Sequence, residues 1–322
     1  MQVNQDPTKP KSSFVKKITR EAKFIVSSEL YSRISLDSLD ALNSLIESKT
    51  DLKATLDSSP EEHRRRELLR LGCYYFSEPF SSETGLTNFN PPQSVHAMVR
   101  DAAYCGDLYY VDLIAEMLDG VGASIKRGEN ILDFGASSGR IIKTLSTVYS
   151  EANFYGCDPN EDAIKWASEN INKAHLFVSS EFPPLPVDND FFDIIYAVSI
   201  WSHFSESSAL AWMEEMHRIA KPGAYFIWTT HGFGSLAHYW KSKKMNGPRL
   251  KTAEEALERD GFHFIDVFSG KGDWGVGMSN WGQTFINPIY VLKHMLPIGW
   301  KLCTYAHRRS EANQDVYLFQ KI

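Results

Sequence analysis

The sequence lacks any long hydrophobic run and any excess of positive charge. Its longest apolar stretches, such as residues 191–201, are far shorter than the ~20 residues that a helix needs to cross a bilayer, so we expect no membrane span. Across 322 residues, 34 Lys and Arg face 40 Asp and Glu, and the net charge is −6. Such a chain has no general attraction to phosphate backbones, so we expect no nucleic-acid partner.

Cysteine is also scarce, and its spacing carries no metal or disulfide signature. Cys73, Cys105, Cys157 and Cys303 lie far apart without a C-x-x-C pair, and no H-E-x-x-H motif occurs. We therefore expect neither a bound metal nor a disulfide framework. The N-terminal residues are polar and lack the pattern of a secretory leader, which predicts a cytoplasmic protein.

The first 125 residues have a helical pattern. Residues 1–60 are rich in Ser, Lys and Asp, with apolar residues at rough helical spacing, which predicts a tail and short helices. The same pattern continues through residues 61–125, for which we expect a helical cap over the following domain. The basic segment near the N-terminus predicts a solvated helix face, with contact to a membrane or an acidic partner as the alternative.

Strands and helices alternate from Glu129 onward. Four short apolar runs, at residues 129–134, 152–158, 191–200 and 223–231, alternate with helical patterns. This order predicts a parallel sheet with helices on both faces. Ligands of such sheets bind beyond the carboxyl ends of the strands. The loops to consider for a site are therefore 135–140, 158–160, 197–204 and 229–235.

The first of these loops, DFGASSGR at residues 133–140, separates a predicted strand from a predicted helix. Its two glycines let the backbone approach a ligand closely. A dinucleotide fingerprint would need glycine where Ser137 and Arg140 stand, so a nicotinamide cofactor is not expected. Asp158 ends the next strand, where a carboxylate can accept hydrogen bonds from a ribose diol.

Together these segments resemble the class I S-adenosylmethionine-dependent methyltransferases. ILDFGASSGR stands at the first motif of that family and FYGCDPN at its acidic second-strand motif. FVSSEFPPLPVDNDFFDIIYAVSIWSHFSE is similar to its adenine-binding loop and fourth strand, and EEMHRIAKPGAYFIWTTHG to its helix, Lys-Pro-Gly turn and fifth strand. The resemblance implies a Rossmann-like, doubly wound α/β sheet of seven strands over residues 126–322, mostly parallel with a final antiparallel strand. It also implies S-adenosylmethionine as the cofactor.

The resemblance implies roles for individual residues as well. Those that would contact the cofactor are Asp133, Gly135, Ser137, Gly139, Asp158, Pro159, Glu181, Phe182 and Ala197. The first four would surround the methionine end, while Asp158 would hold the ribose hydroxyls. Glu181 and Phe182 would hold the adenine, and the fourth-strand backbone would lie near the sulfonium. Ser137 departs from the family, which more often has glycine there.

A methyl acceptor must be held in line with the sulfonium and away from water. A hydroxyl acceptor must also lose a proton, and imidazole has a pKa suited to taking it near neutrality. His231 and His203 follow the fifth and fourth predicted strands. We predict that one of them is the catalytic base, with His231 first, and a packing or capping role is the alternative.

An insertion of about 50 residues, 234–285, follows the fifth predicted strand. Its glycine-rich end carries Trp274 and Trp281. Long loops at a ligand-binding edge are commonly functional, and tryptophan packs well against sugar and other ring faces. We expect the insertion to shape the acceptor pocket, with these tryptophans binding substrate; a purely structural layer is the alternative.

The expected function is therefore S-adenosylmethionine-dependent methyl transfer to a hydroxyl of a small-molecule or glycan acceptor. The resemblance extends loosely to bacterial enzymes of glycan and secondary-metabolite biosynthesis. N-methylation of a small amine and a non-catalytic cofactor-binding scaffold are the alternatives. Nothing in the sequence indicates an oligomeric state.

Overall fold

The computed structural model describes residues 36–59, 64–76, 78–79, 91–92, 95, 104–242, 245, 247–268, 276 and 280–322. The chain divides into two compact units. One comprises Met1–Asn88 and Arg100–Leu113, and the other Phe89–Val99 and Ile114–Ile322. The predicted boundaries near residues 60 and 125 remain predictions.

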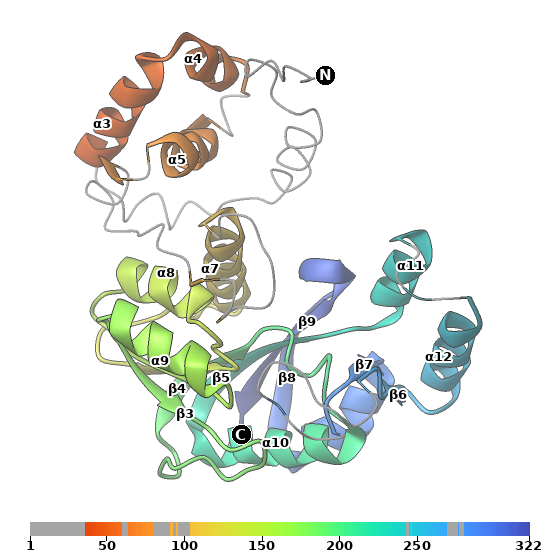
Figure 1. The fold of residues 1–322 in the computed structure, drawn as a ribbon. Coiled ribbons are helices and arrows are strands. Elements are labelled where there is room, and N and C mark those ends of the chain that lie inside the picture. Colours follow the sequence, from red (N-terminus) through yellow and green to blue (C-terminus); the bar gives the residue numbers. More distant parts are fainter. Residues whose placement is uncertain are drawn as a thin grey trace. The chain divides into compact units, whose positions relative to one another are not determined.

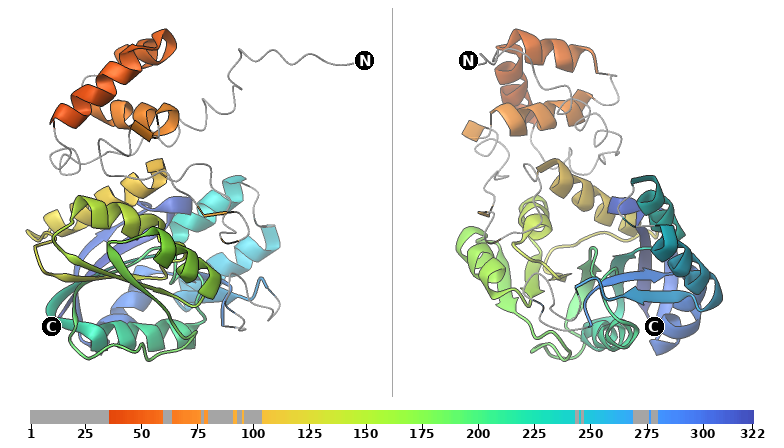
Figure 2. Two further views of the ribbon diagram at one scale, coloured as in Figure 1. Left: turned by 60° about the vertical axis from the view of Figure 1, so that its left-hand side comes forward. Right: turned by 45° about the vertical axis from the view of Figure 1, so that its right-hand side comes forward.

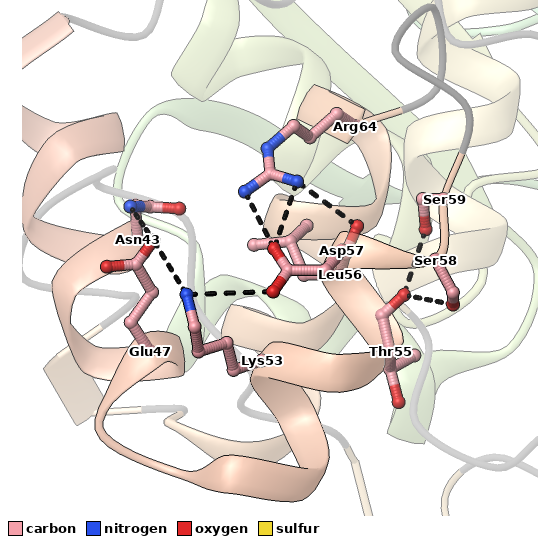
Figure 3. A network of polar contacts seen from close by, with 9 residues as sticks. All are labelled: Asn43, Glu47, Lys53, Thr55, Leu56, Asp57, Ser58, Ser59 and Arg64. Carbon is pink, nitrogen blue, oxygen red and sulfur yellow. Dashed lines mark hydrogen bonds and ion pairs between the residues drawn. The ribbon is translucent and has the colours of Figure 1, made fainter.

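The first unit contains three short helices that pack on one another: α3 (Leu36–Glu47), α4 (Thr50–Asp57) and α5 (Arg64–Tyr75). Their buried apolar side chains are Leu39, Leu42, Ile46, Leu52, Leu56, Leu68 and Leu71. Polar contacts cross the surface, where Arg64 and Lys53 both pair with Asp57, at 3.2 and 3.6 Å (Figure 3). Exposed ion pairs contribute little to stability, so the leucine contacts hold these helices together.

The second unit is built on a seven-stranded sheet with the order β3-β2-β1-β4-β5-β9-β8. Five strands are parallel: β1 (Asn130–Phe134), β2 (Asn153–Asp158), β3 (Ala174–Val178), β4 (Phe192–Ala197) and β5 (Ala220–Thr230). Strand β9 (Asp315–Lys321) runs antiparallel to both of its neighbours, β5 and β8 (Trp300–Ala306) (Figure 1). This topology confirms the predicted fold class.

Helices cover both faces of the sheet (Figure 2). The amphipathic helices α8 (Arg140–Val148) and α9 (Glu161–Asn170) follow β1 and β2, and α10 (Glu206–Ile219) follows β4. The helix α7 (Tyr104–Asp119) precedes the sheet, and the boundary between the two units falls within it. None of the helices that the structure describes is long and apolar enough to cross a membrane.

Aromatic side chains fill the core between the sheet and α10. Trp201, Trp212 and Trp228 are buried there with Phe134. The Phe134 and Trp212 ring centroids lie 4.7 Å apart, and Trp228 stacks on Tyr317 of β9 at 4.6 Å. Such rings bury large apolar areas, so this layer gives a rigid base to the loops that follow β4 and β5.

The predicted insertion forms two helices and a separate hairpin. Helices α11 (Phe233–Ser242) and α12 (Gly247–Arg259) pack against each other, and β6 (Phe262–Ile265) pairs antiparallel with β7 (Gln283–Ile286). After β7 come the short helix α13 (Pro288–Tyr290), the π-helical turn η2 (Val291–Met295) and the 3-10 turn η3 (Leu296–Ile298). A short 3-10 turn, η4 (Glu311–Asn313), precedes β9.

Candidate active site

The predicted site residues gather at one edge of the sheet. Asp158 and Ala197 are the last residues of β2 and β4, and Asp133 is the penultimate residue of β1. Pro159 follows Asp158, Glu181 and Phe182 lie after β3, and His231 comes directly after β5. Since these strands are parallel, their carboxyl ends share one edge, where ligands of such sheets bind.

The loop after β1 requires glycine at two positions. Gly135 and Gly139 have φ angles of 83° and 77°, which L-amino acids with a Cβ rarely adopt. A Cβ on Gly135 would lie 2.1 Å from Cδ1 of Ile200, and one on Gly139 would lie 2.3 Å from Cδ1 of Ile171. Ser137 also has a positive φ, 49°. The serine therefore adopts the left-handed backbone conformation that glycine adopts easily.

Asp158 ties this loop to β2. Its carboxylate accepts hydrogen bonds from the backbone N–H groups of Ser137, at 2.8 Å, and Asn160, at 2.9 Å. Burial raises the pKa of Asp158 to about 6, although these two bonds act in the opposite direction. An ionised carboxylate has about four acceptor positions, so two remain for a further donor pair such as a ribose diol.

Asp133 is a second carboxyl group beside the same loop, and it is almost completely buried. Burial raises its pKa to about 8; the phenol of Tyr196 opposes that shift, and the charge of Asp158 adds to it. Tyr196 lies on β4, directly across from Asp133 in the register of the two strands. A cation placed beside Asp133 would favour the ionised form.

Glu181 and Phe182 lie in the loop between β3 and β4. The Glu181 carbonyl accepts a hydrogen bond from Nε1 of Trp212, at 3.3 Å, which fixes the loop to α10. The Phe182 ring is 38% exposed. An exposed aromatic ring at this edge is available to a flat ligand.

His203 stands in the loop between β4 and α10, and two contacts fix its ring. Its Nδ1 lies 2.7 Å from the Gly282 carbonyl, which can only accept, so Nδ1 carries the proton. The ring stacks on Trp281 with centroids 4.6 Å apart. Burial lowers the pKa of His203, so the ring is neutral near pH 7. Within the described part of the chain, its Nε2 has no hydrogen-bond partner.

His231 is buried, and both of its ring nitrogens are bonded. Ser235 donates its hydroxyl proton to the Asn313 carbonyl and therefore accepts from Nδ1 of His231, at 3.1 Å. The hydroxyl of Tyr239 lies 3.1 Å from Nε2 and donates to it. Burial lowers the pKa of His231 to about 3. This neutral histidine fastens α11 to the end of β5.

A ring of hydrogen bonds holds the loop after β4, and no local sequence pattern predicts it. The Ser199 N–H donates to Oγ1 of Thr229, Thr229 donates to Oε1 of Gln314, and Nε2 of Gln314 donates to Oγ of Ser199, each at 2.7 Å. Ser199 has a φ of 63°, a strained conformation for a residue with a Cβ. The next residue, Ile200, packs on Gly135, so the ring connects Gln314, directly before β9, to the glycine loop.

The end of the insertion forms backbone hydrogen bonds with the loop after β4. The N–H groups of Gly282 and Thr284 donate to the carbonyls of His203 and Ser202, both at 2.8 Å. Trp281 therefore lies beside His203 at the carboxyl edge of the sheet, whereas Trp274 is outside the described residues. Among the side chains that the structure describes, no cluster of three or more His, Cys, Asp or Glu could hold a metal ion.

Comparison with known proteins finds similarity to methyltransferases. Residues 132–228 match a family model described as a methyltransferase domain. Sterol methyltransferase-like 3 of Botryococcus braunii is 24% identical over 190 residues, which are 55% of this chain and 48% of that protein. A fatty-acid O-methyltransferase of Mycolicibacterium smegmatis is 30% identical over 108 residues, 32% of this chain and 37% of that protein. The matches thus span about half or less of each relative.

A solved S-adenosylmethionine-dependent methyltransferase from Aquifex aeolicus has a TM-score of 0.46 and 15% identity, over 73% of this chain and 100% of that one. Residues 132–228 therefore match a methyltransferase domain, in agreement with the family that the sequence motifs resemble. This match agrees with the S-adenosylmethionine cofactor that the sequence motifs imply.

Proposed function

We propose that this chain transfers the methyl group of S-adenosylmethionine to a hydroxyl group of a small-molecule or glycan acceptor. The observation that carries the proposal is the convergence on one sheet edge of a glycine loop, two carboxyl groups and a neutral histidine. The fatty-acid O-methyltransferase relative supports an oxygen acceptor on a small molecule.

The side chains at this edge fit the cofactor. Asp158 retains acceptor positions for the ribose hydroxyls beyond its two backbone bonds. Asp133 is a buried carboxyl group that the ammonium of a methionine moiety would ionise. Glycines at 135 and 139, with Ser137 between them, leave the loop backbone open to the methionine end. Glu181 and Phe182 serve the adenine, and Pro159 and Ala197 border the nucleoside and the sulfonium.

His203 acts as the base in this proposal. Its Nδ1 proton is held by the Gly282 carbonyl, so the lone pair lies on Nε2. The bound cofactor supplies an activated methyl carbon, and Nε2 takes the hydroxyl proton as the acceptor oxygen attacks. The lowered pKa keeps the ring neutral and able to accept that proton.

In the proposal His231 has a structural role, whereas the sequence analysis ranked it ahead of His203 as the catalytic base. Both of its nitrogens are engaged, by Ser235 and Tyr239. It therefore positions α11 instead of taking a proton. Trp281 fixes the His203 ring by stacking and borders the acceptor, and Trp274 stays a predicted acceptor contact.

A second candidate is methyl transfer to carbon. It is favoured by the sterol methyltransferase relatives, among them sterol 24-C-methyltransferase erg6 of Schizosaccharomyces pombe, 27% identical over 107 residues. The same base would then remove a proton from carbon after the methyl group has been added.

Labelled methyl transfer tests the proposal. The full chain is incubated with methyl-labelled S-adenosylmethionine and with lipid and polar extracts in separate reactions. We expect label in a product of low molecular mass with the wild type and a large loss with Asp158→Ala. The product's stability to alkali and acid separates esters, ethers and carbon-bound methyl groups. Cofactor binding without any labelled product in either extract would contradict methyl transfer and favour the scaffold.

A further inference from the structure

Asp133 has one polar neighbour across the sheet. In the strand register it lies directly opposite Gly156 of β2 and Tyr196 of β4. Residues opposite each other on neighbouring strands present their side chains on the same face, about 4.8 Å apart. A Cβ on Gly156 would lie 2.7 Å from Cδ2 of Leu176 and 3.2 Å from Cδ1 of Ile142, so apolar carbon atoms fill that side. Of the two strand neighbours, only Tyr196 can therefore offer a hydrogen bond to the carboxyl group.

The hydroxyl group of Tyr196 is a buried donor that no other group occupies. The side chain is completely buried, and within the described part of the chain its hydroxyl makes no hydrogen bond of regular geometry. Buried polar groups without a partner are rare because they cost free energy. Burial also raises the pKa of this phenol well above its usual range. The proton therefore stays on Tyr196, which can only act as a donor towards a carboxylate.

The carboxyl group of Asp133 is the acceptor nearest to this donor in the register. Burial raises the pKa of Asp133 to about 8, and the phenol of Tyr196 is the strongest influence in the opposite direction. A carboxylate accepts hydrogen bonds more strongly than a protonated carboxyl group, because charge-assisted bonds are shorter and stronger. Tyr196 therefore gains a full partner when Asp133 loses its proton.

We propose that Tyr196 is a positioning residue, whose hydroxyl holds the ionised carboxylate of Asp133 in place for the ammonium group of S-adenosylmethionine. This inference rests on the proposed cofactor site. As the ammonium group arrives, the proton of Asp133 leaves to solvent, and the carboxylate pairs with the ammonium while it accepts from the phenol. Tyr196 acts on the cofactor only through Asp133. Because it stabilises the ionised form, it lowers the free energy needed to remove that proton.

Other titratable groups also face Asp133 from the elements packed around it. Besides burial, the charge of Asp158 at the end of β2 raises the pKa of Asp133, and Arg140 at the start of α8 lowers it. Cys157 of β2 is a buried thiol, and burial together with the charges of the two carboxyl groups raises its pKa. Tyr196→Phe leaves these groups unchanged and keeps the buried ring. The variant therefore isolates the effect of one hydroxyl group.

The pH dependence of cofactor binding tests the inference. The full chain is titrated calorimetrically with S-adenosylhomocysteine, which has the same ammonium group, at a series of pH values. Without the phenol, Asp133 should keep its proton to a pH about one unit higher. We expect Tyr196→Phe to bind about tenfold more weakly than the wild type near pH 6.5, and within about twofold of it near pH 9, where Asp133 ionises in both proteins. Tyr225→Phe, on the same face of the sheet but opposite Ile194, is the matched control and should bind as the wild type does at every pH.

A loss of affinity that is equal at every pH would indicate a purely structural role for Tyr196 and overturn the inference, as would equal binding by Tyr196→Phe and the wild type near pH 6.5. A second measurement needs no ligand: NMR of isotope-labelled aspartate carboxyl groups in the free chain, with the Asp133 signal assigned through Asp133→Asn. We expect its titration midpoint to lie about one pH unit higher in Tyr196→Phe, and an unchanged midpoint would overturn the inference. If the midpoint shifts but the wild type binds no S-adenosylhomocysteine, the proposed cofactor site is wrong, whereas the pairing of Tyr196 with Asp133 stands.

Discussion

The two carboxyl groups of the site, Asp158 and Asp133, have different electrostatic roles. Asp158 is held by two backbone N–H groups, and burial raises its pKa only to about 6. Asp133 has a stronger shift, to about 8. At pH 7 the first is largely ionised and the second largely protonated. A cationic ligand beside Asp133 therefore has to displace a proton.

This difference predicts that cofactor binding releases a proton near neutral pH. In the folded chain the raised pKa of Asp133, from 3.8 to about 8, favours the protonated form. The contribution of this carboxyl group to the stability of the folded chain is fully present below about pH 4. It is lost as the pH rises through 8, where Asp133 ionises in the folded chain. We expect the affinity for S-adenosylmethionine to rise between about pH 6 and pH 7.5. Calorimetry in buffers of different ionisation enthalpy measures the release.

Asp133→Asn cannot ionise and should abolish that buffer dependence, while Asp162→Asn, an exposed acid at the start of α9, should leave it unchanged. A binding enthalpy that is the same in all buffers for the wild type would contradict the assignment of Asp133 to the ammonium.

The two histidines should respond differently to the same substitution. His203→Gln removes the proposed base and should lower turnover by about 10²–10⁴, with unchanged binding of S-adenosylhomocysteine. His231→Gln breaks the bonds to Ser235 and Tyr239 and should lower the free energy of unfolding by about 1–3 kcal/mol. Rates on an identified hydroxyl acceptor and denaturant titrations separate the two effects. A normal rate for His203→Gln would place the base elsewhere.

At the scale of elements, the sequence predicts what depends on local pattern. Strands β1, β2, β4 and β5 are apolar runs with short loops, and the glycine loop is recognisable because positive φ angles favour one residue type. Strand β3 was not identified as a separate run, since this edge strand is only partly buried. Strand β7 was missed as well, because its four residues become a strand only by pairing with β6.

The contacts that arrange the candidate site could not be predicted from the sequence, because they join residues far apart in the chain. Gly282 accepts from His203 across 79 residues, and Gln314 reaches Ser199 across 115. No local pattern marks a glycine carbonyl or a glutamine as a partner of a loop so far away. The roles of His203 and His231 therefore depend on geometry that only the folded chain has.

The insertion should affect the acceptor and not the cofactor. Trp281 stacks on His203, and its loss would free that ring without touching the glycine loop. We expect Trp281→Ala to raise the KM of the acceptor or lower kcat, with little change in the Kd of S-adenosylhomocysteine. Trp166→Ala on α9 is the matched control and should change neither acceptor constant. Weakened cofactor binding by Trp281→Ala alone would contradict this view of the insertion.

For the whole molecule, one compact unit contains every described candidate residue. Asp133, Asp158, His203, His231 and Trp281 all fall within Ile114–Ile322. The sheet brings them to one edge because its parallel strands end together, and Gln314, directly before β9, is hydrogen-bonded to Thr229 and Ser199 at that edge. The helical cap predicted for residues 61–125 remains a prediction.

The most direct test of this account is calorimetric titration of the full chain with S-adenosylhomocysteine. We expect the wild type to bind and Asp158→Ala to bind more weakly by roughly 1.5–3 kcal/mol, because hydrogen bonds to a charged group are lost. Asp162→Ala, four residues further on and exposed, should bind as the wild type does. No binding by the wild type, or equal binding by Asp158→Ala, would contradict the cofactor site at the ends of β1 and β2.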